Sequence, residues 1–208
     1  MFSRILILAP HTDDGELGCG GTITKFVEEK ADVWYAAFSA VKVELEGFPE
    51  DALKSELEKA MKVLGVSERN VLTYGYQVRQ FSYHRQQILD DLVKLRRDIS
   101  PDIVLMPSLV DLHQDHKTIA EEGRRAFKKD TILGYEQPWN NISFNTVCFV
   151  PLEERHVERK LEALACYETQ QYRTYLSPEF IRGLARTRGT QIEKAYAEAF
   201  EVVRWVMD

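Results

Sequence analysis

Two short stretches of the chain combine histidines with carboxylates at spacings that suit metal binding. They are His11-Thr12-Asp13-Asp14 and, much later in the chain, His113-Gln114-Asp115-His116. One imidazole crowded against two adjacent carboxylates is unfavourable unless a cation binds among them. Two imidazoles and one carboxylate drawn from both stretches, with a position left for water, would form the ligand set of a catalytic Zn²⁺ site. Such an ion lowers the pKa of its water to ~7 and polarises a carbonyl oxygen.

The residues left over in the two stretches would supply the other parts of an amide hydrolase. A spare carboxylate could take a proton from the attacking water, and a spare histidine could stabilise the oxyanion and protonate the leaving amine. Each stretch alone also has a plain structural explanation, because His-x-Asp-Asp can cap a turn and His-x-x-His can lie on the surface. Their occurrence together, each after a predicted strand, favours the metal site.

Apolar runs precede both stretches and must position them. Residues 4–8 and 103–106 have the length and composition of buried strands, and a helical pattern follows each. Further strands are predicted at residues 33–38, 70–74, 131–135 and 144–150. Strands that alternate with helices indicate an α/β, Rossmann-like three-layer fold with a mainly parallel sheet. The first and fourth strands of such a sheet flank its switch point, so the two loops can face each other.

The rest of the chain fits the same architecture. We predict a loop at residues 39–48, a helix that begins at Pro49, a charged helix at residues 153–168 and a short helix after Ser177-Pro178. Residues 196–205 fit either a strand or a helix. There is no internal repeat or linker, so residues 1–208 are expected to form a single domain.

Four glycines follow the first stretch: Gly15, Gly18, Gly20 and Gly21. We interpret them as a loop that turns tightly beneath the ion before a helix starts. Their spacing does not fit the G-x-G-x-x-G of dinucleotide sites, and the lysine of a P-loop is missing. A nucleotide-binding module is therefore the weaker interpretation. Cys19, among these glycines, is interpreted as a packing residue, with thiolate ligation as the alternative.

Composition excludes some classes of function. The 208 residues are 44% hydrophobic and carry a net charge of −6, which argues against nucleic acid as a partner. No apolar run approaches the length of a membrane span, and residues 1–3 lead straight into a short strand, so neither a membrane segment nor a signal peptide is expected. The three cysteines are widely spaced and suggest a reduced cytoplasmic protein. A homo-oligomer is compatible with this composition.

The two stretches resemble the signature motifs of a known family. His11-Thr12-Asp13-Asp14 with Leu17-Gly18-Cys19-Gly20-Gly21-Thr22 resembles the His-Pro-Asp-Asp signature of the LmbE-like zinc de-N-acetylases, which include N-acetylglucosaminyl-phosphatidylinositol de-N-acetylase (PIG-L). The second stretch, which follows Pro107-Ser108, resembles the family's His-x-Asp-His signature. The resemblance implies that zinc is held by His11, Asp14 and His116. It further implies Asp13 as general base, His113 as electrostatic stabiliser and acid, and Asp115 as the residue that orients His113.

The chain departs from the family pattern at three positions. Thr12 replaces the usual proline and Gly15 a frequent glutamate, but neither position is a ligand in that pattern. Asp111 stands where the mycothiol-pathway enzyme has a tyrosine, which argues against that substrate. A His₂-carboxylate set suits Fe²⁺ as well as Zn²⁺, so Fe²⁺ is the alternative metal.

Substrate contacts are predicted in the loops around these stretches. Trp139, beside Asn140 and Asn141, could offer an aromatic face and amide groups to a sugar ring, although it could equally be a packing residue. Arg79, Arg85 or Arg173 could pair with a phosphate or carboxylate on the substrate, although a solvated arginine is the commoner case.

The function expected from the sequence is that of a zinc-dependent hydrolase. It would remove the acetyl group from an N-acetylated amino sugar or a glycoconjugate that contains one. Two alternatives remain open at this point: a metal-dependent amidase that acts on a non-sugar amide, and a non-catalytic sugar-binding protein that keeps the metal site.

Overall fold

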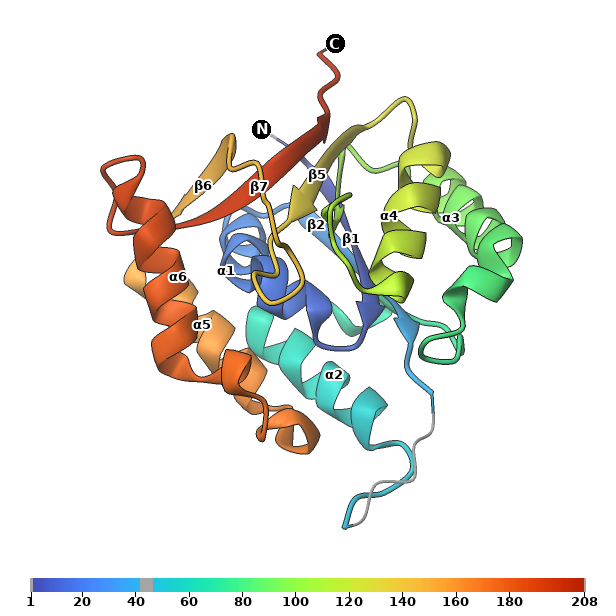
Figure 1. Ribbon diagram of the computed structural model, residues 1–208, viewed down its shortest axis with the longest axis horizontal. Coiled ribbons are helices and arrows are strands. Elements are labelled where there is room, and N and C mark those ends of the chain that lie inside the picture. Colours follow the sequence, from blue (N-terminus) through green and yellow to red (C-terminus); the bar gives the residue numbers. More distant parts are fainter. Residues whose placement is uncertain (1, 42–46, 208) are drawn as a thin grey trace.

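The computed structural model describes residues 2–41 and 47–207 (Figure 1). The strands of this part of the chain are β1 (Arg4–His11), β2 (Asp32–Ser39), β3 (Val71–Thr73), β4 (Ile103–Pro107), β5 (Thr131–Tyr135), β6 (Cys148–Leu152) and β7 (Tyr196–Arg204). The α-helices are α1 (Asp14–Glu28), α2 (Ala52–Leu64), α3 (Arg85–Ile99), α4 (Gln114–Ala126), α5 (Glu154–Ala165) and α6 (Pro178–Thr190). None of the helices in the described ranges is long and apolar enough to cross a membrane.

The described strands form one mixed sheet in the order β3-β2-β1-β4-β5-β7-β6. The first five strands along the chain run parallel, and β7 lies antiparallel between β5 and β6. The tail, which the sequence left open between strand and helix, is therefore a strand. The predicted α/β fold with a mainly parallel sheet is confirmed.

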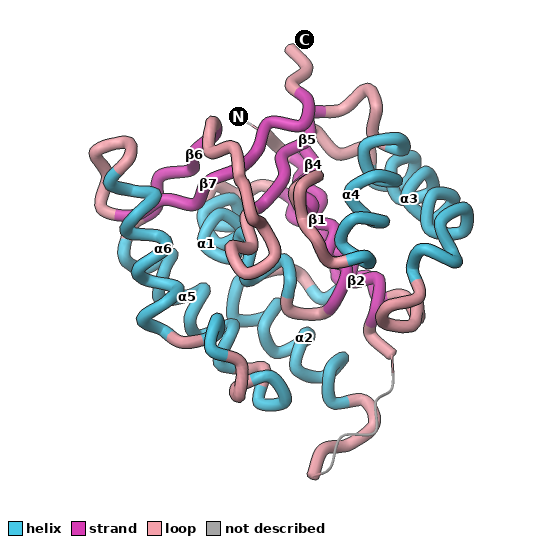
Figure 2. Tube along the Cα trace, viewed as in Figure 1, coloured by secondary structure: helices cyan, strands magenta, loops and turns pink. Residues whose placement is uncertain are grey.

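Helices cover both faces of the sheet and make three layers (Figures 1 and 2). Successive side chains of a strand point to opposite faces, and β1 shows the consequence. Ile5 and Ile7 lie in a core cluster with residues of α1, α2 and α5. Leu6 and Leu8 lie in a second cluster with residues of α3 and α4. The apolar run at residues 4–8 is continuous in sequence, and does not alternate with polar residues, because both faces of β1 are buried.

The neighbouring positions of β1 and β4 bring the two histidine stretches together. Ile5 pairs with Ile103 and Ile7 with Leu105, so the strands run side by side and end at the same edge of the sheet. Helix α1 begins after β1 and α4 begins after β4, on opposite faces. This is the switch point at which ligands of open α/β sheets bind, and the predicted facing of the two loops is confirmed.

The glycine-rich stretch is helical, and its interpretation as a loop was wrong. All four glycines lie inside α1. A Cβ at Gly15 would lie 2.5 Å from Cε2 of Tyr35, and a Cβ at Gly18 would lie 2.3 Å from Cδ2 of Tyr135. Glycine is therefore required because α1 packs its first turns directly against tyrosine rings of the sheet.

Helix α1 is broken at Cys19, where φ is −149° and ψ is 27°. The backbone groups freed at the break find partners from distant elements. The Glu198 carboxylate accepts hydrogen bonds from the N–H groups of Gly21 (3.0 Å) and Thr22 (2.7 Å). The Lys160 ammonium donates to the carbonyl of Leu17 (2.8 Å) and pairs with Glu198 at 2.7 Å. A buried ion pair from α5 and β7 thus caps both sides of the break.

Cys19 itself is fully buried in the core, and its thiol donates to the carbonyl of Gly15 at 3.2 Å. Burial, followed by the charge of Glu198, raises the pKa of this thiol well above its usual value. Because the thiol is enclosed in the core and bonded to a backbone carbonyl, Cys19 acts as a packing residue, as expected.

Two predicted boundaries were displaced. Helix α2 begins at Ala52, because the carbonyl of Pro49 accepts the Ala52 N–H in a turn that precedes the helix. Strand β6 was predicted to begin at residue 144. It begins at Cys148, because its pairing with β7 starts there. Much of the loop predicted at residues 39–48 lies outside the described residues.

Candidate active site

A cavity of about 340 Å³ opens where β1 and β4 end. Residues of both histidine stretches line it, together with parts of the loops that follow β3, β5 and α5. A groove of about 620 Å³ between α2 and β3 is larger, but lysines, glutamates and apolar residues line it, without a histidine. The cavity at the strand ends is therefore the candidate site.

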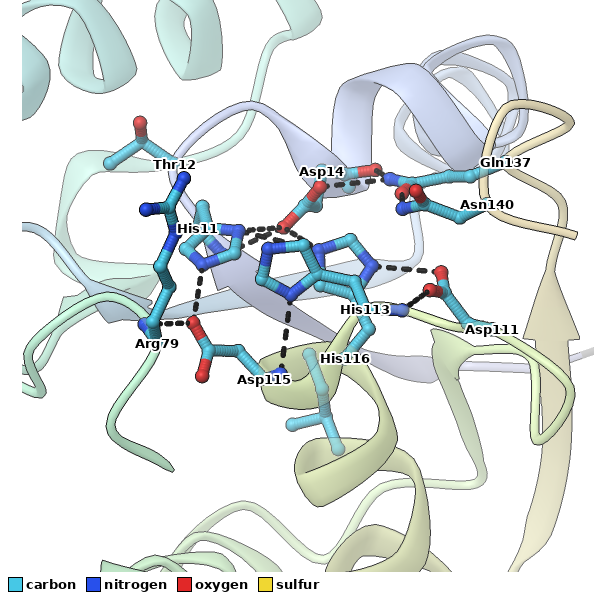
Figure 3. A network of polar contacts seen from close by, with 12 residues as sticks. His11, Thr12, Asp14, Arg79, Asp111, His113, Asp115, His116, Gln137 and Asn140 are labelled. Atoms are coloured by element: carbon cyan, nitrogen blue, oxygen red, sulfur yellow. Dashed lines mark hydrogen bonds and ion pairs between the residues drawn. The ribbon is translucent and has the colours of Figure 1, made fainter. Parts of the chain in front are cut away.

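His11, Asp14 and His116 converge in this cavity (Figure 3). Oδ2 of Asp14 lies 3.1 Å from Nδ1 of His11 and 3.2 Å from Nε2 of His116. The two ring nitrogens lie 3.3 Å apart. Ligands bonded to one tetrahedral Zn²⁺ are separated by roughly 3.3 Å, given bonds of about 2.0–2.1 Å. The chemistry and spacing of these three donors therefore fit a single first-row metal ion.

His113 lies beside this cluster and enlarges the choice of ligands. One nitrogen from each of His11, His113 and His116 lies within 4.8 Å of the others. The His113 ring centroid is 4.5 Å from that of His116 and 5.0 Å from that of His11. The set that contains Asp14 is the tighter one, because its three donor atoms approach one another to 3.3 Å or less.

Carboxylates behind the rings fix which nitrogen each histidine presents. Oδ2 of Asp115 lies 3.1 Å from Nε2 of His11, so Nδ1 of that ring faces Asp14. Oδ2 of Asp111 lies 2.8 Å from Nδ1 of His116, so Nε2 of that ring faces Asp14. Metal-ligating histidines usually hold such carboxylate partners, which orient the ring and increase its basicity.

The expectation that Asp115 orients His113 was therefore wrong as regards its carboxylate. Besides His11, this carboxylate accepts hydrogen bonds from the N–H groups of Arg79 (2.6 Å) and Phe81 (3.3 Å). Only the backbone N–H of Asp115 reaches His113, at Nδ1 (3.2 Å). His113 is the N-cap of α4, and this N–H is the helix group that its side chain caps.

Two functional residues were missed by the sequence reasoning. Asp111, considered only as the place of an absent tyrosine, binds His116 and accepts the His113 N–H at 2.8 Å. Gln137, just after β5, donates from Nε2 to Oδ1 of Asp14 at 2.9 Å. The available signal was positional: each follows a strand that ends at the same edge as β1.

The electrostatics of the cluster favour a cation. Burial opposes charge on the Asp14 carboxyl, but His116 and His11 outweigh it and hold the pKa of Asp14 well below its usual value. Burial likewise opposes protonation of the two rings, but nearby carboxylates, Asp14 foremost, raise the pKa of His11 to about 9 and of His116 to about 10. The buried carboxylates thus demand positive charge, which protons or a metal ion can supply.

Asp13 and His113 line the cavity next to the cluster. Burial, followed by the charge of Asp14, raises the pKa of Asp13 to about 6. The Asp13 side chain makes no capping hydrogen bond to α1, although it occupies the cap position. Burial, followed by the charges of His116 and His11, lowers the pKa of His113 to about 4. His113 is therefore neutral at pH 7, and because its Nδ1 accepts a hydrogen bond, its proton resides on Nε2.

A buried polar layer supports the first stretch from below. The Tyr167 hydroxyl donates to the carbonyl of Thr12 at 2.6 Å, and the hydroxyls of Tyr35 and Tyr167 both contact the Glu16 carboxyl. The N–H of Gly15 donates to the Tyr35 hydroxyl at 3.1 Å. Burial raises the pKa of Glu16 to about 8. These contacts fix the backbone on either side of Asp13 and Asp14.

Most of the predicted substrate-contacting residues line the cavity. Trp139 and Arg79 line the cavity, as does Arg173. The Trp139 ring also stacks on Tyr175, with centroids 4.1 Å apart and planes 9° apart.

Arg85 does not reach the cavity, contrary to expectation. It is the first residue of α3 and pairs with Glu122 at 2.5 Å and with Glu121 at 2.9 Å, both on α4. The Glu122 side chain has no exposed surface, so its charge requires cationic partners, and Arg125 supplies a second one at 2.6 Å.

Sequence comparisons place the chain among deacetylases. The profile of the GlcNAc-PI de-N-acetylase family, PIG-L, matches residues 6–127, which is more than half of the chain and includes both histidine stretches. The uncharacterized deacetylase YaiS of Escherichia coli (strain K12) is 26% identical over 166 residues, 77% of this chain and 88% of that protein. The diacetylchitobiose deacetylase of Thermococcus kodakarensis is 30% identical over 123 residues, 55% of this chain and 45% of that protein.

Solved structures share the fold at low sequence identity. The conserved protein TT1542 of Thermus thermophilus has a TM-score of 0.80 and 23% identity, over 100% of this chain and 97% of that one. A 4-carboxy-2-hydroxymuconate hydratase of Pseudomonas putida KT2440 has a TM-score of 0.81 and 19% identity, over 99% of this chain and 98% of that one. The zinc-inhibited form of a teicoplanin deacetylase has a TM-score of 0.76 and 14% identity, over 95% of this chain and 96% of that one.

The fold alone does not distinguish a hydratase from a deacetylase, whereas the family profile covers both stretches that build the cavity. The chain therefore belongs to the PIG-L family of LmbE-like deacetylases, which are hydrolases of amide bonds.

Proposed function

We propose that this protein is a zinc-dependent hydrolase that removes the N-acetyl group from an N-acetylated amino sugar or a glycoconjugate containing one. The observation that carries the proposal is the convergence of His11, Asp14 and His116 within 3.3 Å, beside Asp13, in a cavity of a PIG-L family chain. The names of its relatives support an amino-sugar substrate, since one is a diacetylchitobiose deacetylase and another a teicoplanin deacetylase.

His11, Asp14 and His116 would hold the metal, with Zn²⁺ as the first choice and Fe²⁺ as the alternative. When bound there, the ion would polarise the acetyl carbonyl and favour ionisation of a water molecule. Asp111 and Asp115 would keep the two rings in the tautomers that present Nε2 of His116 and Nδ1 of His11.

Asp13 would act as the general base. Its carboxyl lines the cavity and has a pKa of about 6, close to the value at which a base both ionises at neutral pH and holds a proton well. His113 would stabilise the oxyanion by donating its Nε2 proton as a hydrogen bond, because its ring is neutral at pH 7. A neutral ring that gave this proton to the leaving amine would become imidazolate, so the expected role of His113 as acid would require a second proton on the ring.

The wall of the cavity suits a sugar. The stacked rings of Trp139 and Tyr175 both line it and offer an apolar face, and Asn140 adds an amide group. Flat aromatic surface beside a few polar groups is the usual composition of a small-molecule site. A non-sugar amide would use the same metal machinery, and a non-catalytic binding protein would use the same wall, so a measurement of turnover is required.

The test is acetate release from a panel of N-acetylated sugars by zinc-loaded protein, beginning with N,N′-diacetylchitobiose. We expect turnover in the wild type, loss of nearly all turnover with retained zinc in Asp13→Asn, and loss of zinc in His116→Ala. Asp98→Asn, at an exposed carboxylate on α3, is the matched control and should behave as wild type. Full activity of Asp13→Asn would overturn the assignment of the base, and zinc binding without acetate release from any sugar would favour the binding protein.

A further inference from the structure

Two arginines on the cavity wall, Arg79 and Arg173, form no ion pair with any of the described residues. Both line the cavity, and no carboxylate among the described residues lies within ion-pair distance of either guanidinium. Other arginines do find such partners: Arg96 pairs with Asp130 and Arg188 with Glu136. Two arginines without such partners in one cavity give its wall a local positive charge, although the chain as a whole carries a net charge of −6.

The backbone of Arg79 adopts a conformation that favours glycine, so the presence of an arginine at this position needs an explanation. Its φ is +66°, in the left-handed region that glycine adopts without strain and other residues adopt at a cost. The contact that this backbone makes, from its N–H to Oδ2 of Asp115, requires no side chain. Among the described residues the guanidinium has no hydrogen-bond partner. Glycine would thus serve the backbone at this position, and no contact among the described residues calls for the arginine side chain.

Figure 3 shows where this side chain lies. It runs beside His11 towards Thr12, on the side of the His11 ring away from Asp111. A strained residue at the rim of an active site is a recognised sign of function.

Arg173 is held on another part of the same wall. Its Nε donates to Oε1 of Gln170 at 2.7 Å, and its guanidinium carbon lies 5.1 Å from the ring centroid of Tyr172 and 5.6 Å from that of Tyr175. These contacts position the guanidinium without cancelling its charge. Tyr175 in turn stacks on Trp139, so the arginine adjoins the aromatic face described above.

We propose that Arg79 and Arg173 bind an anionic group, phosphate or carboxylate, that the amino-sugar substrate carries in addition to its acetamide. This inference rests on the proposed deacetylase function and narrows its substrate class. Guanidinium groups recognise both oxyanions through paired N–H donors. The four carboxylates of the site, those of Asp13, Asp14, Asp111 and Asp115, form no ion pair with either guanidinium, and Arg173 acts on Asp13 only through space. A neutral sugar would leave both guanidinium groups unpaired beside a bound cation.

The test compares kcat/KM of the zinc-loaded enzyme for charged and neutral substrates. N-acetylglucosamine 1-phosphate, N-acetylglucosamine 6-phosphate and N-acetylmuramic acid present a phosphate or a carboxylate, and N,N′-diacetylchitobiose is the neutral reference. We expect at least one charged substrate to be preferred about tenfold or more, since hydrogen bonds to charged groups are the strong ones. The preferred member of the panel distinguishes phosphate from carboxylate.

Arg79→Gly removes the guanidinium and relieves the backbone strain, so the variant should fold at least as well as the wild type. We expect Arg79→Gly and Arg173→Gln each to lower the charged-to-neutral ratio of kcat/KM about tenfold, and Arg79→Lys to lower it less. Arg124→Ala removes an equal charge from an exposed position on α4 outside the cavity and should leave the ratio unchanged. A preference for the neutral substrate, or a ratio unchanged in both arginine variants, would overturn the inference.

A binding measurement separates this inference from the proposed function. Calorimetric titration of zinc-loaded protein with N-acetylglucosamine 1-phosphate should give a Kd about tenfold higher in Arg79→Gly than in the wild type. Because both proteins contain the metal, phosphate bound to zinc does not contribute to the difference. If no sugar releases acetate but this difference is found, the deacetylase function fails and the anion site stands. If the wild type and Arg79→Gly bind equally, the anion site fails whatever the turnover.

Discussion

Oδ2 of Asp115 lies 3.1 Å from Nε2 of His11, and this contact joins the two histidine stretches into one site. Asp115 belongs to the first turn of α4, whereas His11 ends β1. The same carboxylate accepts the N–H of Arg79, so it also anchors the loop after β3. One buried side chain therefore sets the ring orientation of a proposed ligand and the backbone of a proposed substrate contact.

Asp115→Asn should weaken zinc binding about 10–100-fold, because a neutral amide orients His11 less firmly and lowers its basicity. The measurement is a competitive zinc titration against a chelator, with acetate release recorded at saturating zinc. Asp98→Asn is the control for loss of one negative charge at an exposed site. If zinc affinity were unchanged and only kcat fell, Asp115 would act through His113, as the family resemblance implied, and not through His11.

The pH profile tests Asp13. Burial and the neighbouring Asp14 carboxylate raise the pKa of Asp13 to about 6, and a base works only when ionised. Activity should therefore be complete above this pKa and fall as the pH decreases through it. A bound cation favours the ionised carboxylate and moves the acid limb to lower pH, so about 6 is its upper position. The measurement is kcat/KM against pH with neutral N,N′-diacetylchitobiose, whose own charge does not change. An acid limb above pH ~7 would instead indicate an imidazole base.

The sequence predicted the strands and histidine stretches that form the site because these depend on local patterns. The apolar runs of β1 and β4 and the two histidine stretches are contiguous in the chain, and the rule for parallel sheets then places them together. The partner of Asp115 could not be predicted in this way, since His11 lies in a distant segment. Arg85 was misassigned for the same reason: its partner Glu122 is buried only because α3 packs on α4.

The glycines of α1 were misassigned for a different physical reason. Glycine disfavours helices by about 1 kcal/mol per residue, so a local reading predicts a loop. The close approach of α1 to Tyr35 and Tyr135 outweighs that cost, and such packing is visible only in three dimensions.

Gly18→Ala should destabilise the protein by about 2 kcal/mol. The added Cβ would lie 2.3 Å from Cδ2 of Tyr135, a buried ring that is tied to the carbonyl of Leu8 through its hydroxyl at 3.0 Å. Gly183→Ala, inside α6, is the matched control, because its Cβ would meet no atom within 4 Å. There alanine should stabilise by about 0.5–1 kcal/mol through helix propensity alone. Urea unfolding of both variants checks the prediction, and equal effects at the two glycines would contradict it.

Lys160→Met should destabilise the protein by about 3–5 kcal/mol, because it leaves the Glu198 carboxylate buried without its cation at the break in α1. The free energy of unfolding is to be measured for Lys160→Met, Glu198→Gln and the double variant, so that the coupling between the two side chains is obtained. Removal of both charges should cost less than the sum of the single changes, since neither ion then remains unpaired. The exposed pair of Lys54 and Glu58, 3.8 Å apart on α2, is the matched control and should show a coupling below about 0.5 kcal/mol. If Lys160 and Glu198 coupled no more strongly than that pair, the Gly21 and Thr22 amides alone would satisfy Glu198, and the break would not depend on the lysine.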